Sequence, residues 1–413
     1  MNVSILHYAA PPVVGGVEST IYHHARLLSG SGYQVKIFAG RGEEFDDRIP
    51  FIQLPEIDSR YASVIQVGNQ LASGAIKEDF ISLRDKLHKD LQINLGDSDV
   101  LIVHNAITLH KNLPLTAALR LISDSGKLHL IAWCHDFAWQ DKLYTPDLHP
   151  GYPWDLLNNP WPGVRYVTVS EHRRNRLSEL LKLPRSFIDV VPPGIDFHQF
   201  LSLSPLSQEI VDRLQLIDAE PLLLLPARIT RRKNIEFSIQ VIQSLSRTYP
   251  NAILIISGPP GPHNPKNIAY LNSLRDLRAK LQVESNVHFL YELRGEDQVL
   301  NIPDETIAEL YRVADVLIFP SYREGFGIPV LEAGLARTPV FAANIPSVQE
   351  SSSGLINVFD PNGDPDEVAA RIHETLISDQ AYQLRKRVIK KYTWQSILKK
   401  QIIPMIEEFG QPK

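Results

Sequence analysis

Short apolar runs alternate with helix-like patterns along the first half of the chain. Five runs predict buried strands, at residues 3–8, 34–38, 100–104, 128–133 and 164–169, and the stretches 20–28 and 78–91 have the spacing of amphipathic helices. Beyond residue 196 the pattern lapses through residues 197–208 and then restarts, with strands expected at 221–229, 252–256, 287–290, 316–319 and 339–342. Strands that alternate with helices indicate βαβ units around a parallel sheet.

The lapse and restart predict two α/β domains, each a Rossmann-like, doubly wound parallel sheet. The boundary is expected near residues 197–220, and 413 residues suffice for two separate cores. We assign residues 1–200 to the first domain, 201–393 to the second, and 394–413 to a C-terminal helix that packs back on the first. Ligands of such sheets bind outside the carboxyl ends of the strands, so the loops there are the places to seek chemistry.

Composition and charge narrow the class of protein. The chain is 44% hydrophobic and 22% charged, which is typical of a globular protein, and its net charge of −5 gives no reason to expect nucleic acid as a partner. Cys134 is the only cysteine, which excludes an internal disulfide and favours a reducing compartment. No run approaches the about 18 apolar residues that span a bilayer, and the N-terminus lacks the basic start of a signal peptide. We expect a cytoplasmic protein without an integral membrane segment.

The first strand leads into the loop PPVVGGVES. Gly15 and Gly16 have no side chains, so a ligand can approach the backbone, and the following helix N-terminus favours an anion. A phosphate site and a plain tight turn both fit these two glycines. The dinucleotide fingerprint does not fit, because a third glycine is missing and the second strand closes without an acidic residue. A nicotinamide-dependent dehydrogenase is therefore disfavoured.

The second domain has a stronger signal. Arg228, Arg231, Arg232 and Lys233 follow its first strand and lead into a helix, an arrangement that suits a diphosphate, and we choose Arg228 and Lys233 as the binding cations. Glu324 and Glu332, with seven residues between them, flank the start of a later helix. The backbone amides between them can donate to sugar hydroxyls; they belong to Gly325, Phe326 and Gly327.

These features together resemble the retaining glycosyltransferases of family 4, which have the GT-B fold. The resemblance extends over nearly the whole chain and rests on GGVE at 15–18, CHD at 134–136, VTVSEHRRNRL at 167–177, VVPPGID at 190–196, ARITRRKN at 227–234, ISGPPG at 256–261, EGFGIPVLEA at 324–333 and NIPSVQE at 344–350. It implies an active site between the two domains and a nucleotide sugar, with UDP-glucose favoured and GDP-mannose next.

The resemblance also assigns roles to residues. Glu324 is expected at the donor sugar and Glu332 at the ribose, while Arg228 and Lys233 hold the diphosphate and His135 approaches the sugar near the reacting carbon. Gly15, Gly16 and Gly258 are expected to border the nucleotide sugar. Such enzymes are thought to let the leaving phosphate take the acceptor's proton, so the resemblance implies no metal and no cofactor besides the nucleotide-sugar co-substrate.

Three other patterns have plainer interpretations. Asp97-Ser98-Asp99 spells a metal-binding DxD, but it directly precedes a predicted strand and fits an Asx turn better. His23 and His24 are neighbours on a helix and point in different directions, so they cannot easily share a metal. Cys134 and His135 are neighbours on a strand and point to opposite faces, so Cys134 is expected in the core.

The acceptor is less well determined by the sequence. Arg173 lies in the first helical turn after Ser170, and the loop 137–161 contains five Trp or Tyr residues, including Trp139 and Tyr144, whose rings suit sugars. We expect Arg173, Ser170, Trp139 and Tyr144 to bind the acceptor, which would be a small soluble sugar, sugar phosphate or sugar acid. A lipid or glycan-chain acceptor at a membrane surface, with peripheral membrane contact, and a non-catalytic nucleotide-sugar-binding protein stay open as alternatives, and the oligomeric state is not indicated.

Overall fold

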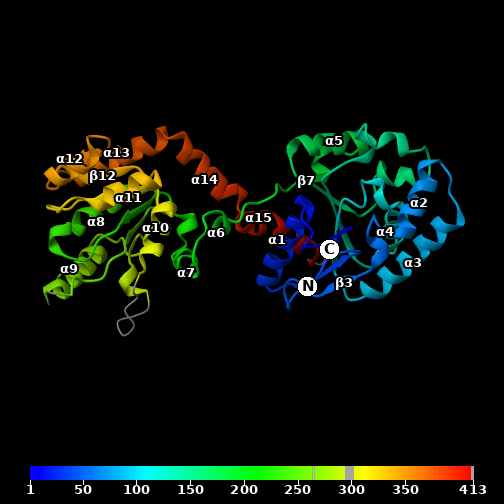
Figure 1. The fold of residues 1–413 in the computed structure, drawn as a ribbon, viewed down its shortest axis with the longest axis horizontal. Coiled ribbons are helices and arrows are strands. Elements are labelled where there is room, and N and C mark those ends of the chain that lie inside the picture. Colours follow the sequence, from blue (N-terminus) through cyan, green and yellow to red (C-terminus); the bar gives the residue numbers. More distant parts are fainter. Residues whose placement is uncertain (263, 265, 294–301, 411–413) are drawn as a thin grey trace. The chain divides into compact units, whose positions relative to one another are not determined.

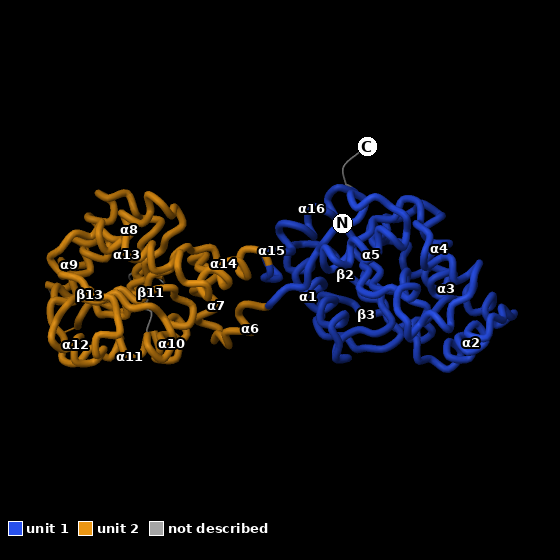
Figure 2. The backbone as a smooth tube through the Cα atoms, turned by 90° about the horizontal axis from the view of Figure 1, so that it is seen from above, with its two compact units in different colours: residues 1–195, 392–413 blue, residues 196–391 orange. Residues whose placement is uncertain are grey.

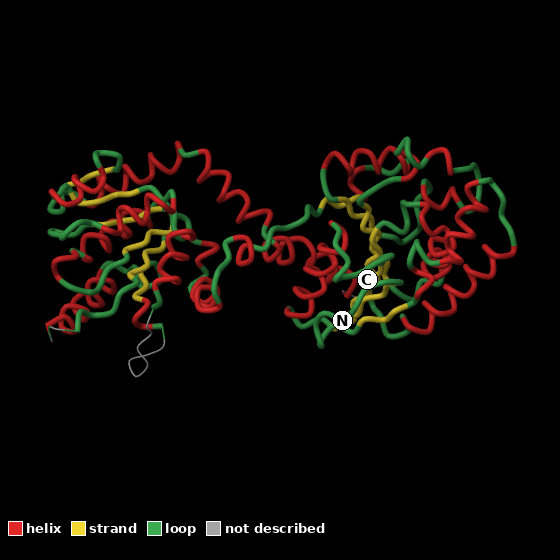
Figure 3. The backbone as a smooth tube through the Cα atoms, viewed as in Figure 1, coloured by secondary structure: helices red, strands yellow, loops and turns green. Residues whose placement is uncertain are grey.

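The computed structural model describes residues 1–262, 264, 266–293 and 302–410. It divides into two compact units, of which unit 1 contains residues 1–195 and 392–413 and unit 2 contains residues 196–391 (Figure 2). Each unit has a sheet of parallel strands covered by helices, as Figure 3 shows for each separately. No helix among the described residues is long and apolar enough to cross a bilayer.

The sheet of unit 1 has seven parallel strands in the order β3-β2-β1-β4-β5-β6-β7. The strands are β1 (Asn2–Leu6), β2 (Gln34–Ala39), β3 (Phe51–Gln53), β4 (Val100–His104), β5 (His129–Cys134), β6 (Arg165–Thr168) and β7 (Ile188–Val190). Successive side chains of a strand point to opposite faces, so Val100 and Ile102 enter one core while Leu101 and Val103 enter another. Both faces are therefore covered, which explains why β4 is apolar from Val100 to Val103.

The helices of unit 1 lie on both faces of this sheet. They are α1 (Gly16–Gly30), α2 (Ala62–Ala72), α3 (Glu78–Asn94), α4 (Leu113–Asp124) and α5 (Glu171–Leu181). The end of the chain adds α15 (Trp394–Ile397), a π-helical turn (Leu398–Ile402) and α16 (Ile403–Glu407). Trp394, Ile402 and Ile406 are buried in the same core as α1, so this terminal segment is part of unit 1.

The sheet of unit 2 has six parallel strands in the order β10-β9-β8-β11-β12-β13. They are β8 (Leu222–Leu225), β9 (Ile253–Ile256), β10 (Val287–Phe289), β11 (Val316–Phe319), β12 (Val340–Ala343) and β13 (Asn357–Phe359). The helices are α6 (Phe197–Phe200), α7 (Pro205–Arg213), α8 (Ile235–Ser246), α9 (Lys266–Lys280), α10 (Asp304–Val313), α11 (Ile328–Ala336), α12 (Pro346–Ser352), α13 (Pro365–Ser378) and α14 (Gln380–Tyr392), labelled where room allows in Figure 1. The prediction of two doubly wound parallel sheets is confirmed.

Residues 197–208, where the sequence pattern lapses, are folded as part of unit 2. Asp196 caps α6 by accepting from the backbone N–H of Gln199, and Ser204 caps α7. The carboxylate of Glu309 on α10 accepts from both the backbone N–H and the hydroxyl of Ser204, at 2.9 and 2.7 Å. The segment in which the sequence pattern lapses is thus held to the body of unit 2, and the chain passes between the units at residues 195–196 and 391–392.

Candidate functional site

In unit 2 the strand order reverses between β8 and β11, which are neighbours in the sheet. The loops after these two strands, at 226–234 and 320–327, therefore diverge at the carboxyl edge of the sheet. A doubly wound sheet offers its ligand crevice at such a point, because the loops on either side leave in opposite directions. Both motifs that the sequence singled out in this half occupy these two loops.

Glu324 is held by two cations from the opposite loop. The Lys233 ammonium lies 2.6 Å from Oε1 of Glu324, and the Arg232 guanidinium donates to Oε2 at 2.9 Å. Lys233 is buried, with its ammonium 5.0 Å from the centre of the Phe319 ring, whereas Arg232 is half exposed. The structure thus brings together Lys233 and Glu324, which are 91 residues apart in sequence.

Burial and charge act in opposite directions on this pair. Burial alone would raise the pKa of Glu324, but the hydrogen bond from Lys233 and the nearby positive charges outweigh burial and lower it. Burial lowers the pKa of Lys233, and Glu324 offsets part of that effect. The lowered pKa keeps the Glu324 carboxylate charged at neutral pH. A protonated Lys233 has three N–H groups, so it can donate to Glu324 and to an anionic ligand at the same time.

Glu332 lies in the second turn of α11 and is exposed. Its Oε2 accepts a hydrogen bond of 2.7 Å from the hydroxyl of Tyr311, a buried residue of α10. Gly327, with φ of 93°, begins α11 in a left-handed conformation that favours glycine. Gly325 and Phe326 are exposed before it, so this helix N-terminus is open to solvent.

Arg228 and Gly258 lie where the loops after β8 and β9 touch. Arg228 is exposed, and Gly258 packs so closely that an added Cβ would lie 2.5 Å from the carbonyl oxygen of Ala227. Backbone hydrogen bonds from Gly258 to Ala227 and from Ile229 to Pro259 join the two loops. The structural requirement for glycine at position 258 is therefore this contact between loops.

In unit 1 the strand order reverses between β1 and β4. Gly15 and Gly16 follow β1 and begin α1, but their surroundings differ. A Cβ on Gly15 would lie 2.1 Å from the carboxylate of Glu18, whereas nothing lies within 4 Å of one on Gly16. The space beside Gly15 is thus taken by the chain's own carboxylate, and only Gly16 leaves room for an outside molecule.

His135 directly follows β5 and contacts a second histidine at the end of β4. Its Nε2 lies 3.1 Å from Nδ1 of His104, and Nδ1 of His7 donates to the His104 carbonyl oxygen at 2.9 Å. Burial first, and then the charge of Arg173, lower the pKa of His135 to about 4. Burial likewise lowers the pKa of His7 to about 4 and that of His104 well below its usual value, so these imidazoles are neutral at pH 7.

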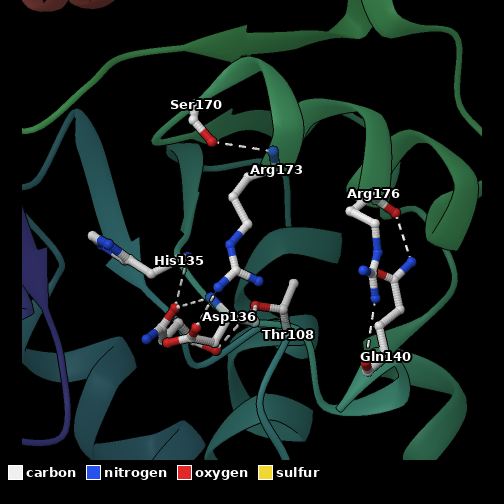
Figure 4. A network of polar contacts seen from close by, with 8 residues as sticks. Thr108, His135, Asp136, Gln140, Ser170, Arg173 and Arg176 are labelled. Atoms are coloured by element: carbon white, nitrogen blue, oxygen red, sulfur yellow. Dashed lines mark hydrogen bonds and ion pairs between the residues drawn. The ribbon is translucent and has the colours of Figure 1, made fainter.

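Arg173 extends from α5 toward the loop after β5, as Figure 4 shows. Ser170 caps α5 by accepting from the backbone N–H of Arg173, and the guanidinium donates to Asp136 Oδ1 at 3.2 Å. The side chains of Arg173 and Asp136 are 39% and 51% exposed, so a bound anion can reach this pair. Beside it, Arg176 and Gln140 are joined by three hydrogen bonds that fix α5 to the same loop.

The aromatic residues of the loop 137–161 do not all line open space. Trp154 and Trp161 are 2% exposed and lie in the core, so their rings are not open to a sugar. Trp139 is half-buried and its indole N–H donates to the carbonyl of Trp154. Tyr144 is half-buried against the same core, beside the ring of His110 and under the Lys111 ammonium.

The three secondary patterns have structural roles. Asp99 accepts from the backbone N–H of Asn2, and Asp97 pairs with Lys36 at 2.5 Å, so the DxD carboxylates tie neighbouring strands together rather than form a local turn. His24 is fully buried, and the ring of its neighbour His23 stacks on Trp394. Cys134 is buried as expected, and burial raises the pKa of its thiol to about 12.

Sequence reasoning did not select Arg232, Tyr311 or His104 as contacts of the site. Arg232 belongs to the cluster of cations after β8, from which the sequence favoured Arg228 and Lys233, whereas Tyr311 precedes Glu332 by 21 residues and no local pattern marks it. His104 has one detectable signal, because it is a polar residue at the carboxyl end of an otherwise apolar strand beside the switch point. The residues that the sequence assigned to a single active site are divided between the two units.

Comparison with known proteins agrees with this geometry. Residues 14–199 match the family model described as Glycosyltransferase Family 4, and residues 207–393 match that described as Glycosyl transferases group 1. The chain is 26% identical over 382 residues to the mannosylglucosylglycerate synthase of Petrotoga mobilis. This match covers 86% of this chain and 85% of the relative.

Two further relatives are matched over less of their length. An uncharacterised glycosyltransferase of Methanocaldococcus jannaschii is 27% identical over 63% of this chain, and the match spans 64% of that protein. The D-inositol 3-phosphate glycosyltransferase of Nocardia farcinica is 29% identical over 46% of this chain and 41% of its own length. The two family models together take in nearly all of both doubly wound units, and the chain therefore belongs to the family 4 glycosyltransferases of the GT-B fold.

Proposed function

We propose that this glycosyltransferase moves a hexosyl group from a nucleotide sugar, UDP-glucose first and GDP-mannose next, to a small soluble acceptor with retention of configuration. The acceptor is a sugar, a sugar phosphate or a sugar acid. The observation that carries the proposal is the carboxylate of Glu324 held between Lys233 and Arg232 at the switch point of unit 2. A carboxylate suits the hydroxyls of a sugar, and the cations beside it suit the diphosphate to which that sugar is attached.

The proposed reaction needs positive charge on the leaving group. The bond between the sugar's anomeric carbon and the diphosphate breaks, the acceptor oxygen bonds to the same face of that carbon, and the acceptor's proton passes to a leaving phosphate oxygen. In this proposal Lys233, Arg228 and the exposed N-terminus of α11 stabilise the developing negative charge. We propose that these groups suffice without a metal ion.

The acceptor class is supported by Arg173 and by two relatives. Arg173 keeps a partly exposed guanidinium beside His135, where it can receive a phosphate or carboxylate. The relatives are named for a glycerate glycoside and for inositol 3-phosphate, both of which carry an anionic group. In this proposal Asp136 holds the Arg173 guanidinium in place until the acceptor anion binds to that guanidinium, either in place of Asp136 or beside it.

A panel of UDP-, GDP- and ADP-sugars tests the donor first. A ligand at 100 times its dissociation constant adds about 2.7 kcal/mol to stability, which thermal unfolding detects readily. The stabilising sugar is then incubated with 3-phosphoglycerate, glycerate and inositol phosphate, and the anomeric configuration of the product is read by NMR. An inverted product contradicts retention, transfer only to lipid in anionic vesicles contradicts the acceptor class, and binding without any transfer indicates a non-catalytic protein.

A further inference from the structure

The ring of His135 is not held by its own loop alone. Nε2 of His135 lies 3.1 Å from Nδ1 of His104, and the two rings are inclined by only 28° with centres 5.4 Å apart. His104 is fully buried and stacks on Trp133 at 5.6 Å, so its ring has no freedom to turn. The contact with the immobile His104 ring therefore fixes the orientation of the His135 ring, which is the more exposed of the two.

The backbone around His135 is held by the same short segment. Asn105, with φ of 60°, adopts a left-handed conformation, and its side-chain oxygen accepts from the backbone N–H groups of both His135 and Asp136. The hydroxyl of Thr108 donates to the carbonyl of Asp136 at 2.7 Å. Asparagine tolerates this conformation better than most residues, so residues 104–108 act as a rigid support for the loop after β5.

The hydrogen bonds of His104 indicate which of its ring nitrogens carries the proton. His104 has one buried ring nitrogen, Nε2, that has no hydrogen-bond partner among the described residues. An unpartnered lone pair is less costly in a core than an unpartnered N–H group. Nδ1 of His104 is then the protonated nitrogen and donates to Nε2 of His135. A neutral His135 that accepts at Nε2 carries its own proton at Nδ1.

We propose that His104 is a positioning residue that fixes the orientation and tautomer of His135, so that His135 offers Nδ1–H to an oxygen of the bound ligand. This inference rests on the proposed function for the identity of that ligand, but the tautomer itself exists in the ligand-free protein. It assigns a task to a buried histidine that lies outside the motifs recognised in the sequence.

Long-range ¹H–¹⁵N spectra of ligand-free protein labelled at histidine test the tautomer directly. The resonances of His135 are identified by their loss in His135→Asn, and we expect the Nδ1–H form in the wild type. In His104→Leu this form should give way to a mixture of tautomers. The inference is overturned if the wild type shows Nε2–H at His135, or if the leucine variant, checked for folding by tryptophan fluorescence, keeps the wild-type tautomer.

Isosteric amides give the matched kinetic test. The amide of asparagine lies near the position of Nδ1 of histidine and that of glutamine near Nε2, so His135→Asn should retain a kcat about tenfold or more above that of His135→Gln. His104→Asn should likewise exceed His104→Leu in kcat, with the KM for UDP-glucose changed by less than about threefold. Equal kcat values within either pair overturn the positioning role. A wild type that transfers no sugar from any donor refutes the proposed function instead, and leaves the spectra to decide the tautomer.

Discussion

Acidification should destabilise unit 1 through His24, and the structure permits a quantitative prediction. His24 is 0% exposed in the core between α1 and the sheet, and neither of its ring nitrogens has a hydrogen-bond partner among the described residues. Burial lowers the pKa of its imidazole to about 3, with smaller contributions from His135 and His23. The unfolded chain has no such burial, so there the same group titrates near its ordinary value of about 6.5.

The direction of the effect follows from proton binding. Between pH 6.5 and pH 3 the unfolded chain binds a proton at His24 that the folded chain does not. The free energy of unfolding is therefore unaffected by His24 above pH 6.5 and decreases as the pH falls from 6.5 toward 3. At pH 5.0 the unfolded group lies about 1.5 pH units below its pKa, and each unit is worth 1.36 kcal/mol, which gives a loss of about 2 kcal/mol relative to pH 7.5.

The perturbation is His24→Phe, studied at pH 7.5 and at pH 5.0. The new ring removes an unpartnered polar group but adds volume, so its effect at a single pH has no certain sign. Those packing effects do not depend on pH and cancel when the two values are compared. The stability of His24→Phe relative to the wild type should therefore rise by about 2 kcal/mol between pH 7.5 and pH 5.0.

Urea unfolding followed by tryptophan fluorescence provides the assay. All five tryptophans, at positions 133, 139, 154, 161 and 394, belong to unit 1, so the signal reports that unit without interference from unit 2. The same substitution at exposed His172 is the matched control and should follow the wild-type pH dependence. A change below about 0.7 kcal/mol between the two pH values would show that His24 is not held neutral by burial.

Four further predictions concern the proposed activity. Glu324→Ala and Lys233→Ala should each lower turnover about a hundredfold while the protein stays folded, and near-wild-type turnover in both variants contradicts the donor site. EDTA should leave turnover unchanged, whereas a loss that Mg²⁺ or Mn²⁺ restores contradicts charge stabilisation by Lys233 and the helix amides. Arg173→Ala should lower kcat/KM for an anionic acceptor by about 1.5 to 3 kcal/mol with nucleotide affinity unchanged by calorimetry, and a collapse of that affinity places Arg173 at the donor instead. Tyr311→Phe removes the 2.7 Å hydrogen bond to Glu332 and should weaken UDP binding about two- to tenfold while leaving a 2′,3′-dideoxy analogue unaffected, and an equal loss for both nucleotides refutes a role at the ribose.

Local pattern was enough to predict the architecture. A strand buried on both faces is apolar at every position, and a helix that covers a sheet repeats its apolar residues every third or fourth position, so β4 and β11 were predicted to the residue. Of the three-residue edge strands, β10 was predicted and β3, β7 and β13 were missed, because so short a run has no periodicity of its own and becomes a strand by pairing with a neighbour. The loops that carry Lys233 and Glu324 were also predictable, since their place after a strand is a property of the local sequence.

What only the tertiary structure decided is which distant side chains meet. The sequence shows that Lys233 and Glu324 follow strands, but the strand order that makes β8 and β11 neighbours is what brings their charges to 2.6 Å. The contact of His104 with His135 and the burial of Trp154 likewise depend on how separate elements pack. Hydrogen bonds and ion pairs form only between atoms a few ångströms apart. Sequence periodicity shows which way the side chains of one helix or strand point, but it does not show which other element they meet. The sequence thus determined the elements and their loops, and packing determined the partners.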